Sequence, residues 1–193
     1  PILERYQRYL FHYRRENGKP LTQRGQVTRL GPLKSFFGWL AKQSRILYNP
    51  ASELDMPLPE KRLPKAVLSI SEAETVLAQA DIREPMGLRD RAILETFYST
   101  GMRRMELVNL QLVDLDSERG TVTIRQGKGK KDRVVPIGER ALAWLEKYLQ
   151  EVRPLLVVDP ADCTNFLTWM GGPFNGNAMT SLVAEYVTAA GVG

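Results

Sequence analysis

The first third of the chain repeats apolar residues with the period of an α-helix. In residues 1–16 six apolar or aromatic side chains recur at helical spacing: Ile2, Leu3, Tyr6, Tyr9, Leu10 and Tyr13. Asn17 and Gly18 predict the end of that helix. A second helix is predicted from about Thr22 to Lys42. Within it, Pro32 predicts a break or kink, because proline lacks the N–H that an interior helical residue donates.

The stretch from Met56 to Leu68 interrupts this helical pattern. It carries three prolines and three cationic residues: Pro57, Pro59, Pro64, Lys61, Arg62 and Lys65. Repeated prolines remove backbone donors and favour an extended path, so residues 57–66 are interpreted as a basic linker between domains. Ser71 then predicts the start of a new helix, because Glu74 three positions later completes a capping box.

Beyond the linker the period of the pattern changes twice. Residues 87–99 predict a buried helix that stops at Thr100 and Gly101. Three short β-type runs follow, separated by polar or glycine turns: Leu112, Val113 and Leu115, then Val122 and Ile124, then Val134 and Val135. Helical spacing resumes in residues 139–151 and 177–190. This part of the chain is therefore predicted to pack helices around a small antiparallel sheet.

Together these elements predict an α+β protein that is mainly α-helical. Residues 1–56 form a small helical N-terminal domain in this prediction, and residues 67–193 form a helical domain that carries a three-stranded antiparallel sheet. Two units are permitted by 193 residues, since domains commonly hold about 100 to 150. With 43% hydrophobic and 25% charged residues, the chain has the composition of a globular protein with a core.

Charge divides the chain at the same place. Residues 1–65 hold 13 lysines and arginines against 5 acidic residues, a balance of +8, whereas residues 66–193 hold 14 against 17, a balance of −3. Lysine and arginine that neutralise phosphates release condensed counterions, so the first third is predicted to meet a polyanion. A solvated basic surface is the alternative explanation of the same charge.

Composition argues against several other classes of protein. Cys163 is the single cysteine, which excludes an internal disulfide and fits a reducing compartment. His12 is the single histidine, so no zinc cluster and no other metal site is expected. No apolar run approaches the roughly 20 residues that span a bilayer, and Pro1 begins no signal-like pattern. We expect a cytoplasmic protein with no membrane partner.

The stretch STGMRRMELVNL, residues 99–110, is the first candidate for chemistry. Gly101 ends one predicted helix and the next begins at Met102, so Arg103 is expected near a helix start, where free amides favour an anion. A guanidinium suits a phosphate there because it donates two parallel hydrogen bonds. The alternative is a structural pair between Arg103 and Glu106 on the helix surface.

The stretch RQGKGKKDRVVPI, residues 125–137, is the second candidate. Gly127 and Gly129 permit backbone angles closed to other residues, so Lys128 is predicted at the tip of a tight hairpin. The same ribbon carries further cations that suit a DNA groove or backbone: Arg125, Lys130, Lys131 and Arg133. An ordinary charged hairpin, kept soluble by its lysines, is the alternative.

In combination, the two stretches resemble the tyrosine recombinase (phage integrase) family, and the resemblance is close to its Xer-like branch. It rests on the order and spacing of two sets of residues: Thr100, Gly101, Met102, Arg103, Glu106 and Leu107, then Gly127, Lys128, Gly129, Lys131, Arg133 and Pro136. The resemblance covers most of residues 36–193. It implies a helical core-binding domain in residues 1–56 and the N-terminal part of a catalytic domain in residues 67–193.

The resemblance implies a site-specific recombinase that cuts and rejoins strands of duplex DNA through a 3′-phosphotyrosyl intermediate. In this family one arginine holds the scissile phosphate and a hairpin lysine protonates the leaving 5′ oxygen. By position these are Arg103 and Lys128. A preplaced guanidinium stabilises the charge that a pentavalent phosphate gains in the transition state. Covalent storage of the ester energy needs neither ATP nor metal, so no cofactor is expected.

Partners follow from the same resemblance. Duplex DNA is the expected partner, together with other recombinase protomers assembled on it, and no small-molecule substrate is expected. Eight cationic side chains are candidate DNA contacts: Arg24, Arg29, Lys34, Lys42, Arg104, Lys130, Lys131 and Arg133.

The chain departs from the family pattern at its end. The family's histidine and arginine three residues apart, and its nucleophilic tyrosine, belong beyond Gly193. His12 lies in the first predicted helix and cannot serve, and three tyrosines are assigned to packing in helices: Tyr98, Tyr148 and Tyr186. We therefore expect a fragment that lacks the nucleophile and does not cleave DNA alone.

Other functions remain open from the sequence. A DNA-binding protein that uses the same fold without chemistry, such as a truncated regulator or accessory factor, is the main alternative. A scaffold with an incidental basic hairpin predicts no salt-dependent DNA affinity. A type IB topoisomerase shares the chemistry, but the compact size and the Xer-like motifs argue against it.

Overall fold

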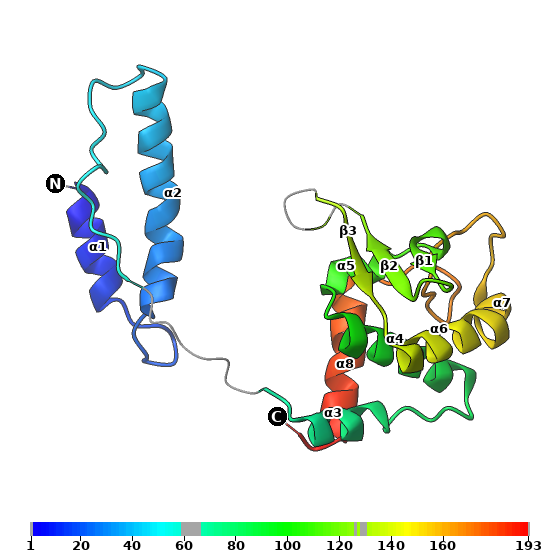
Figure 1. Ribbon diagram of the computed structural model, residues 1–193. Helices are drawn as coiled ribbons and strands as arrows, with labels where there is room; N and C mark the ends of the chain where they lie inside the picture. Colours follow the sequence, from blue (N-terminus) through cyan, green and yellow to red (C-terminus); the bar gives the residue numbers. More distant parts are fainter. Residues whose placement is uncertain (1, 59–66, 126, 128–130, 193) are drawn as a thin grey trace. The chain divides into compact units, whose positions relative to one another are not determined.

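The computed structural model describes residues 2–58, 67–125, 127 and 131–192 (Figure 1). The chain divides into two compact units, Pro1–Lys65 and Ala66–Gly193, and each is described by itself. The predicted linker, residues 57–66, lies mostly outside the described residues. Among the described residues, no helix is both long and apolar enough to cross a membrane.

The first unit is built on two helices, α1 (Ile2–His12) and α2 (Gln23–Lys42). The prediction that the first helix extends to residue 16 was wrong, because the Arg15 N–H donates to the Lys19 carbonyl (3.0 Å) and closes a loop there. Helix α2 begins where the Thr22 hydroxyl accepts a hydrogen bond from the Gly25 N–H. It continues through Pro32 as one helix, so the predicted break is absent.

A small apolar cluster holds this unit together. It consists of four buried leucines: Leu10, Leu21, Leu30 and Leu54. Two polar contacts fix the segment that follows α2 against the helices. The Lys34 ammonium donates to the Leu54 carbonyl (2.9 Å), and the Gln7 amide donates to the Asp55 carbonyl (2.6 Å).

The second unit is organised around the buried helix α4 (Pro85–Thr100), which packs against α6 (Glu139–Glu151). Four shorter or flanking helices surround this pair: α3 (Ile70–Leu77), α5 (Arg104–Val108), α7 (Arg153–Leu156) and α8 (Gly176–Ala189). Ala92 and Ile93 of α4 are fully buried. The helix predicted for residues 87–99 is therefore confirmed as a core element.

Helix α3 corrects the predicted capping box. The helix begins after Ser69, whose hydroxyl accepts from the Glu72 N–H while the Glu72 carboxylate accepts from the Ser69 N–H (2.7 Å). Ser71 and Glu74, which were predicted to form this pair, lie within the helix instead. The helix therefore starts two residues earlier than the sequence suggested.

Three antiparallel strands form the sheet in the order β1 (Leu115–Asp116), β2 (Thr121–Ile124) and β3 (Arg133–Pro136). The predicted first strand was too long, because residues Leu112–Asp114 form a 3-10 turn in which the Asp114 carboxylate accepts from the Gln111 N–H (3.0 Å). Alternate residues of β2 point into the helical core. The fold class predicted from the sequence, mainly helical with a three-stranded antiparallel sheet, is confirmed.

Candidate functional site

Arg103 stands at the junction between α4 and α5. Helix α4 ends at Gly101, which adopts a left-handed conformation (φ 59°) and donates its N–H to the Phe97 carbonyl. Met102 is buried in the core and anchors the turn. Arg103 follows in extended backbone as the N-cap of α5, and its side chain is 57% exposed. The local sequence thus places a guanidinium at the surface on a fixed turn.

The Glu106 carboxylate is the centre of the polar cluster around Arg103. Its Oε1 accepts from the Nη1 atoms of Arg103 (2.9 Å) and Arg133 (2.9 Å). Its Oε2 accepts from the Arg103 backbone N–H (2.8 Å) and from Nη2 of Arg133 (2.6 Å). Four donors occupy a carboxylate that offers about four lone-pair sites. Glu106 is therefore fully engaged in holding two arginines.

These contacts also set the ionisation of Glu106. Hydrogen bonds from Arg133, followed by those from the Arg103 backbone and side chain, lower the pKa of Glu106 to about 2. The carboxylate is 7% exposed and stays charged near neutral pH. A permanently ionised, fully bonded carboxylate is unsuited to accepting a proton, so its role here is to orient its partners.

The hairpin between β2 and β3 returns to this carboxylate. The Gly127 N–H donates to the Lys131 carbonyl (3.0 Å), which brings the two described ends of the hairpin together. A Cβ atom at Gly127 would lie 2.6 Å from Nη1 of Arg133 and 3.3 Å from Oε1 of Glu106. The residue immediately before Lys128 in the chain therefore lies against the carboxylate that binds Arg103.

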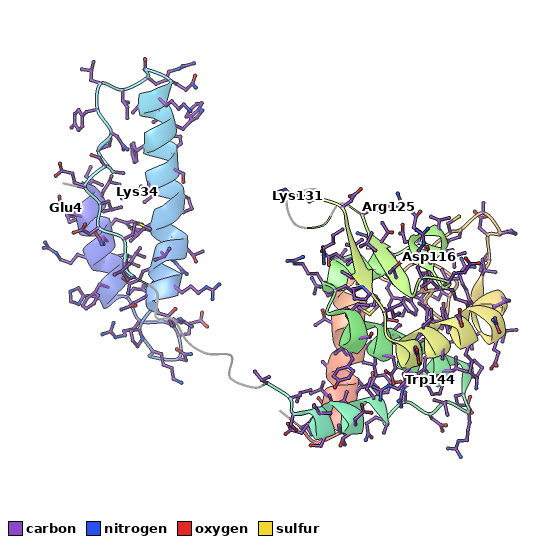
Figure 2. The ribbon with its side chains drawn as sticks, viewed as in Figure 1. Glu4, Lys34, Asp116, Arg125, Lys131 and Trp144 are labelled. Atoms are coloured by element: carbon purple, nitrogen blue, oxygen red, sulfur yellow. The ribbon has the colours of Figure 1, made fainter. Side chains whose placement is uncertain are left out.

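A second ion pair between an arginine and an acidic residue lies at the end of β2. Arg125 follows β2 and donates to the Asp114 carboxylate, whose side chain is 3% exposed. Figure 2 shows Arg125 and Lys131 at the hairpin end of the ribbon formed by β2 and β3. Both side chains belong to exposed residues. The ribbon therefore carries cationic groups next to the Arg103 turn.

The other predicted DNA contacts have varied environments. Arg104 is exposed and donates to the Thr180 hydroxyl of α8 (2.6 Å). Lys128 and Lys130, predicted as the acid and a DNA contact, lie outside the described residues. In the first unit three of the four predicted contacts are exposed: Arg24, Arg29 and Lys42. The fourth, Lys34, is partly buried by its bond to the Leu54 carbonyl.

Sequence reasoning anticipated half of this cluster. The Arg103–Glu106 pair is three residues apart and was proposed as the structural alternative for Arg103. The pair between Glu106 and Arg133 was missed, because the two residues are 27 positions apart and only the fold brings them together. Arg133 was instead predicted to bind DNA directly. No pattern along the sequence signals this pairing.

Tyr148 and Tyr186 have structural environments that explain their positions. The buried Tyr148 hydroxyl donates to the Asn165 carbonyl (3.2 Å) and accepts from the Leu167 N–H (3.0 Å). The Tyr186 hydroxyl donates to the Asp90 carboxylate (2.9 Å). Burial and the negative charge of Asp90 raise the pKa of Tyr186 above its usual value. Neither hydroxyl is disposed to attack a phosphate in solvent.

In the described part of the chain, no group of three or more acidic, histidine or cysteine side chains is arranged to hold a metal ion. His12 is exposed at the end of α1 and Cys163 is exposed in a loop. The polar cluster around Glu106 consists of two guanidinium groups and one carboxylate.

Comparison with known proteins gives consistent matches. Residues 66–192 match the model of the phage integrase family. The chain is 53% identical over 191 residues to tyrosine recombinase XerC 2 of Ralstonia nicotianae, covering 99% of this chain and 55% of that protein. It is 37% identical over 190 residues to tyrosine recombinase XerD of Xanthomonas axonopodis pv. citri, covering 95% and 61%. The chain thus spans little more than half the length of these relatives.

Solved structures share the fold. The XerH site-specific recombinase bound to difH substrate in a pre-cleavage complex superposes with a TM-score of 0.73 at 22% identity, covering 98% of this chain and 53% of that one. The Tn1549 transposon integrase in complex with circular intermediate DNA gives 0.67 at 19% identity, covering 97% and 64%. These two structures show the shared fold, while the family model and the sequence relatives show that the chain belongs to the phage integrase family, among the Xer-like tyrosine recombinases.

Proposed function

We propose that this chain supplies the phosphate-binding part of a site-specific recombinase that cuts and rejoins strands of duplex DNA. The observation that carries the proposal is that the Arg103 guanidinium binds the Glu106 carboxylate while Gly127, at the end of the hairpin, lies close to the same carboxylate. Arg103 and Gly127, the residue that precedes Lys128 in the chain, therefore lie beside one carboxylate. We infer that Arg103 and Lys128 act on the same phosphodiester.

In this proposal Arg103 binds the scissile phosphate. Glu106 takes one N–H of its guanidinium, and the other donors find no acceptor among the described residues. They are available to the nonbridging oxygens, where charge grows in the transition state. Lys128, by its place in the family motif, donates a proton to the leaving 5′ oxygen. The attacking tyrosine forms a 3′-phosphotyrosyl ester, and reversal of the same steps rejoins the strand.

Binding of duplex DNA is assigned to both units. The first unit, with residues 1–56 as a core-binding domain, contributes exposed cations on α2. The second contributes Arg104, Lys131 and the neighbouring lysines of the hairpin. The XerH and Tn1549 structures were solved with DNA, and this chain has their fold. Assembly with other recombinase protomers on DNA in the cytoplasm completes the proposal.

Fusing this chain to the remaining part of the Ralstonia relative, of which it covers 55%, tests the cleavage role. We expect the fusion to form a covalent complex with a cognate duplex. Arg103→Ala should abolish that complex and preserve most of the DNA affinity. Arg83→Ala is the matched control, since it removes the same charge from an exposed pair with Asp81. Cleavage by the Arg103→Ala fusion equal to that of the control would refute the assignment.

The acid role of Lys128 has a separate chemical test. Lys128→Ala should lose cleavage of an ordinary duplex and regain it on a duplex with sulfur at the 5′ bridging position, because a thiolate leaves without a proton. A variant that is inactive on both duplexes would remove Lys128 from the acid role.

DNA affinity of the 193-residue chain separates the proposal from a scaffold function. Reversing the charge of Lys130 and Lys131 should flatten the plot of log affinity against log salt by about 0.9 for each lost phosphate contact. Fluorescence anisotropy with a labelled duplex measures this slope. A slope equal to that of the unmodified chain would exclude both lysines from the interface. A wild-type fusion that binds DNA but never forms a covalent complex would favour the non-catalytic DNA-binding alternative.

A further inference from the structure

Arg133 is the first residue of β3 and lies opposite Ile124 of β2 in the hairpin register. Its guanidinium leaves the ribbon and reaches α5, where Nη1 and Nη2 donate to the two oxygens of Glu106 at 2.9 and 2.6 Å. This parallel pair of bonds is the strong geometry of an arginine with a carboxylate. The pair ties the sheet to the turn that carries Arg103.

The same geometry leaves Arg133 poorly suited to hold DNA. The Nη1 and Nη2 groups, which together could bind a phosphate, already donate to the two oxygens of Glu106. Hydrogen bonding to Glu106 also raises the pKa of the Arg133 guanidinium above its usual value, as expected for a cation paired with a carboxylate. A phosphate would have to displace a carboxylate that is 7% exposed.

Gly127 connects this pair to the hairpin. It is buried, and it leaves space for only a hydrogen atom where a Cβ would meet Arg133 Nη1 at 2.6 Å and the Lys131 carbonyl at 3.0 Å. The hairpin backbone thus rests directly on the guanidinium of Arg133. Lys128 is covalently attached to Gly127, so whatever fixes Gly127 fixes one end of the segment that bears Lys128.

We propose that Arg133 is a positioning residue that couples the hairpin to the Arg103 turn through Glu106. It acts in two ways. First, its guanidinium packs against Gly127 and holds it in place. Second, it neutralises the Glu106 carboxylate, which would otherwise draw the Arg103 guanidinium inward and repel a phosphate. The inference rests on the proposed function, because coupling has a catalytic consequence only if Arg103 and Lys128 act on one phosphodiester.

Amide hydrogen exchange on the 193-residue chain tests the coupling without any need for activity. In Arg133→Gln the amides of Gly127 and Arg103 should both exchange about tenfold faster, although these residues lie on different elements. Arg125→Gln is the matched control, since it removes the same charge from the same ribbon but pairs with Asp114. There the Arg103 amide should change less than about twofold.

Two outcomes overturn the inference. One is an Arg103 amide that exchanges at the wild-type rate in Arg133→Gln. The other is an equal effect in both variants, which would indicate general loosening of the ribbon. If Arg133→Gln does not fold, Gly127→Ala provides the same test, because its Cβ displaces Nη1 of Arg133 while all charges remain. It should accelerate exchange at the Arg103 amide as well.

Cleavage by the fusion described above gives the functional readout. Arg133→Gln should slow cleavage of an ordinary duplex, and sulfur at the 5′ bridging position should restore part of the rate, because a misplaced Lys128 is then no longer needed. Arg133→Lys should not restore the rate on the ordinary duplex, since one ammonium cannot make two parallel bonds. Equal slowing on both duplexes would contradict the proposal that Arg133 holds the hairpin in place. A wild-type fusion without cleavage would instead refute the proposed function and leave the exchange result intact.

Discussion

Glu106→Gln removes the charge that holds Arg103 and Arg133 together. The substitution keeps the size of the side chain but replaces one acceptor oxygen by an NH₂ group that faces a guanidinium. The pKa of Glu106 is lowered from 4.5 to about 2, which corresponds to a stabilisation of the folded state by about 3 kcal/mol before solvent screening is considered. Solvent screens part of this, because Arg103 and Arg133 are 57% and 36% exposed. We therefore expect a loss of about 1 to 2 kcal/mol in the free energy of unfolding at pH 7.

The pH dependence follows from the sign of the shift. A carboxyl whose folded pKa is depressed stabilises the folded state above its unfolded pKa, and this contribution is lost as pH falls through the folded value. The difference in the free energy of unfolding between wild type and Glu106→Gln should thus be constant above about pH 5 and shrink between about pH 4.5 and pH 2.

Urea unfolding followed by tryptophan fluorescence measures this difference. Trp144 and Trp169 report on the second unit, and a Trp39→Phe background removes the signal of the first. Glu118→Gln is the control, since it removes the same charge from an exposed turn. A difference that stays constant from pH 7 to pH 2.5 would show that Glu106 does not stabilise the unit through its charge.

Three further predictions concern the fold that supports the site. Glu95→Gln should destabilise the second unit by about 2 to 3 kcal/mol in the same urea titration, because this carboxylate is 1% exposed and accepts three hydrogen bonds from guanidinium groups. Glu74→Gln is the control: the Glu74 side chain is 42% exposed, so its loss should cost under about 1 kcal/mol. Gly87→Ala should cost about 3 kcal/mol, because its Cβ would lie 2.0 Å from the Asp81 carbonyl oxygen; an unchanged urea midpoint would contradict this. Gly38→Ala in α2, where a Cβ would make only an ordinary contact with the Asn49 side-chain amide (3.9 Å), should instead stabilise the first unit by about 0.5 to 1 kcal/mol, seen as a higher melting temperature.

Long periodic elements were predictable because their pattern repeats several times. Helix α6 has the predicted bounds 139–151, and α8 begins and ends one residue before the predicted 177–190. The central helix α4 extends the predicted range 87–99 by two residues at its start and one at its end. In each case a stripe of apolar residues covers several turns, so one ambiguous residue at an end changes little.

Short local signals were less decisive where two of them competed. Ser69 and Ser71 are each followed three positions later by a glutamate, Glu72 and Glu74. Both pairs satisfy the capping-box pattern equally, and the structure uses the first. Glu74 is then free to accept from Arg140 of α6 (2.8 Å). A long-range contact of this kind cannot be read from local spacing.

The site shows the same division between local and distant information. The turn at Gly101 and the pair of Arg103 with Glu106 are encoded within a few residues, so sequence reasoning anticipated both. The bond from Arg133 to Glu106 depends on how β3 packs beside α5. Arg133 was assigned to DNA because a basic ribbon suggests that role, while the structure gives its guanidinium an internal partner.

The charge balance of the second unit illustrates why composition alone misjudges this surface. Its formal balance is −3, which by itself argues against an anion-binding face. At the site, however, the acidic partners are buried and the basic ones exposed, since the side chains of Glu106 and Asp114 are 7% and 3% exposed against 57% for both Arg103 and Arg125. Any anion that approached this surface would meet the guanidinium groups first, and the carboxylates behind them fix the direction of those groups. Local positive potential at a recognition site therefore depends on which charges reach solvent rather than on their sum.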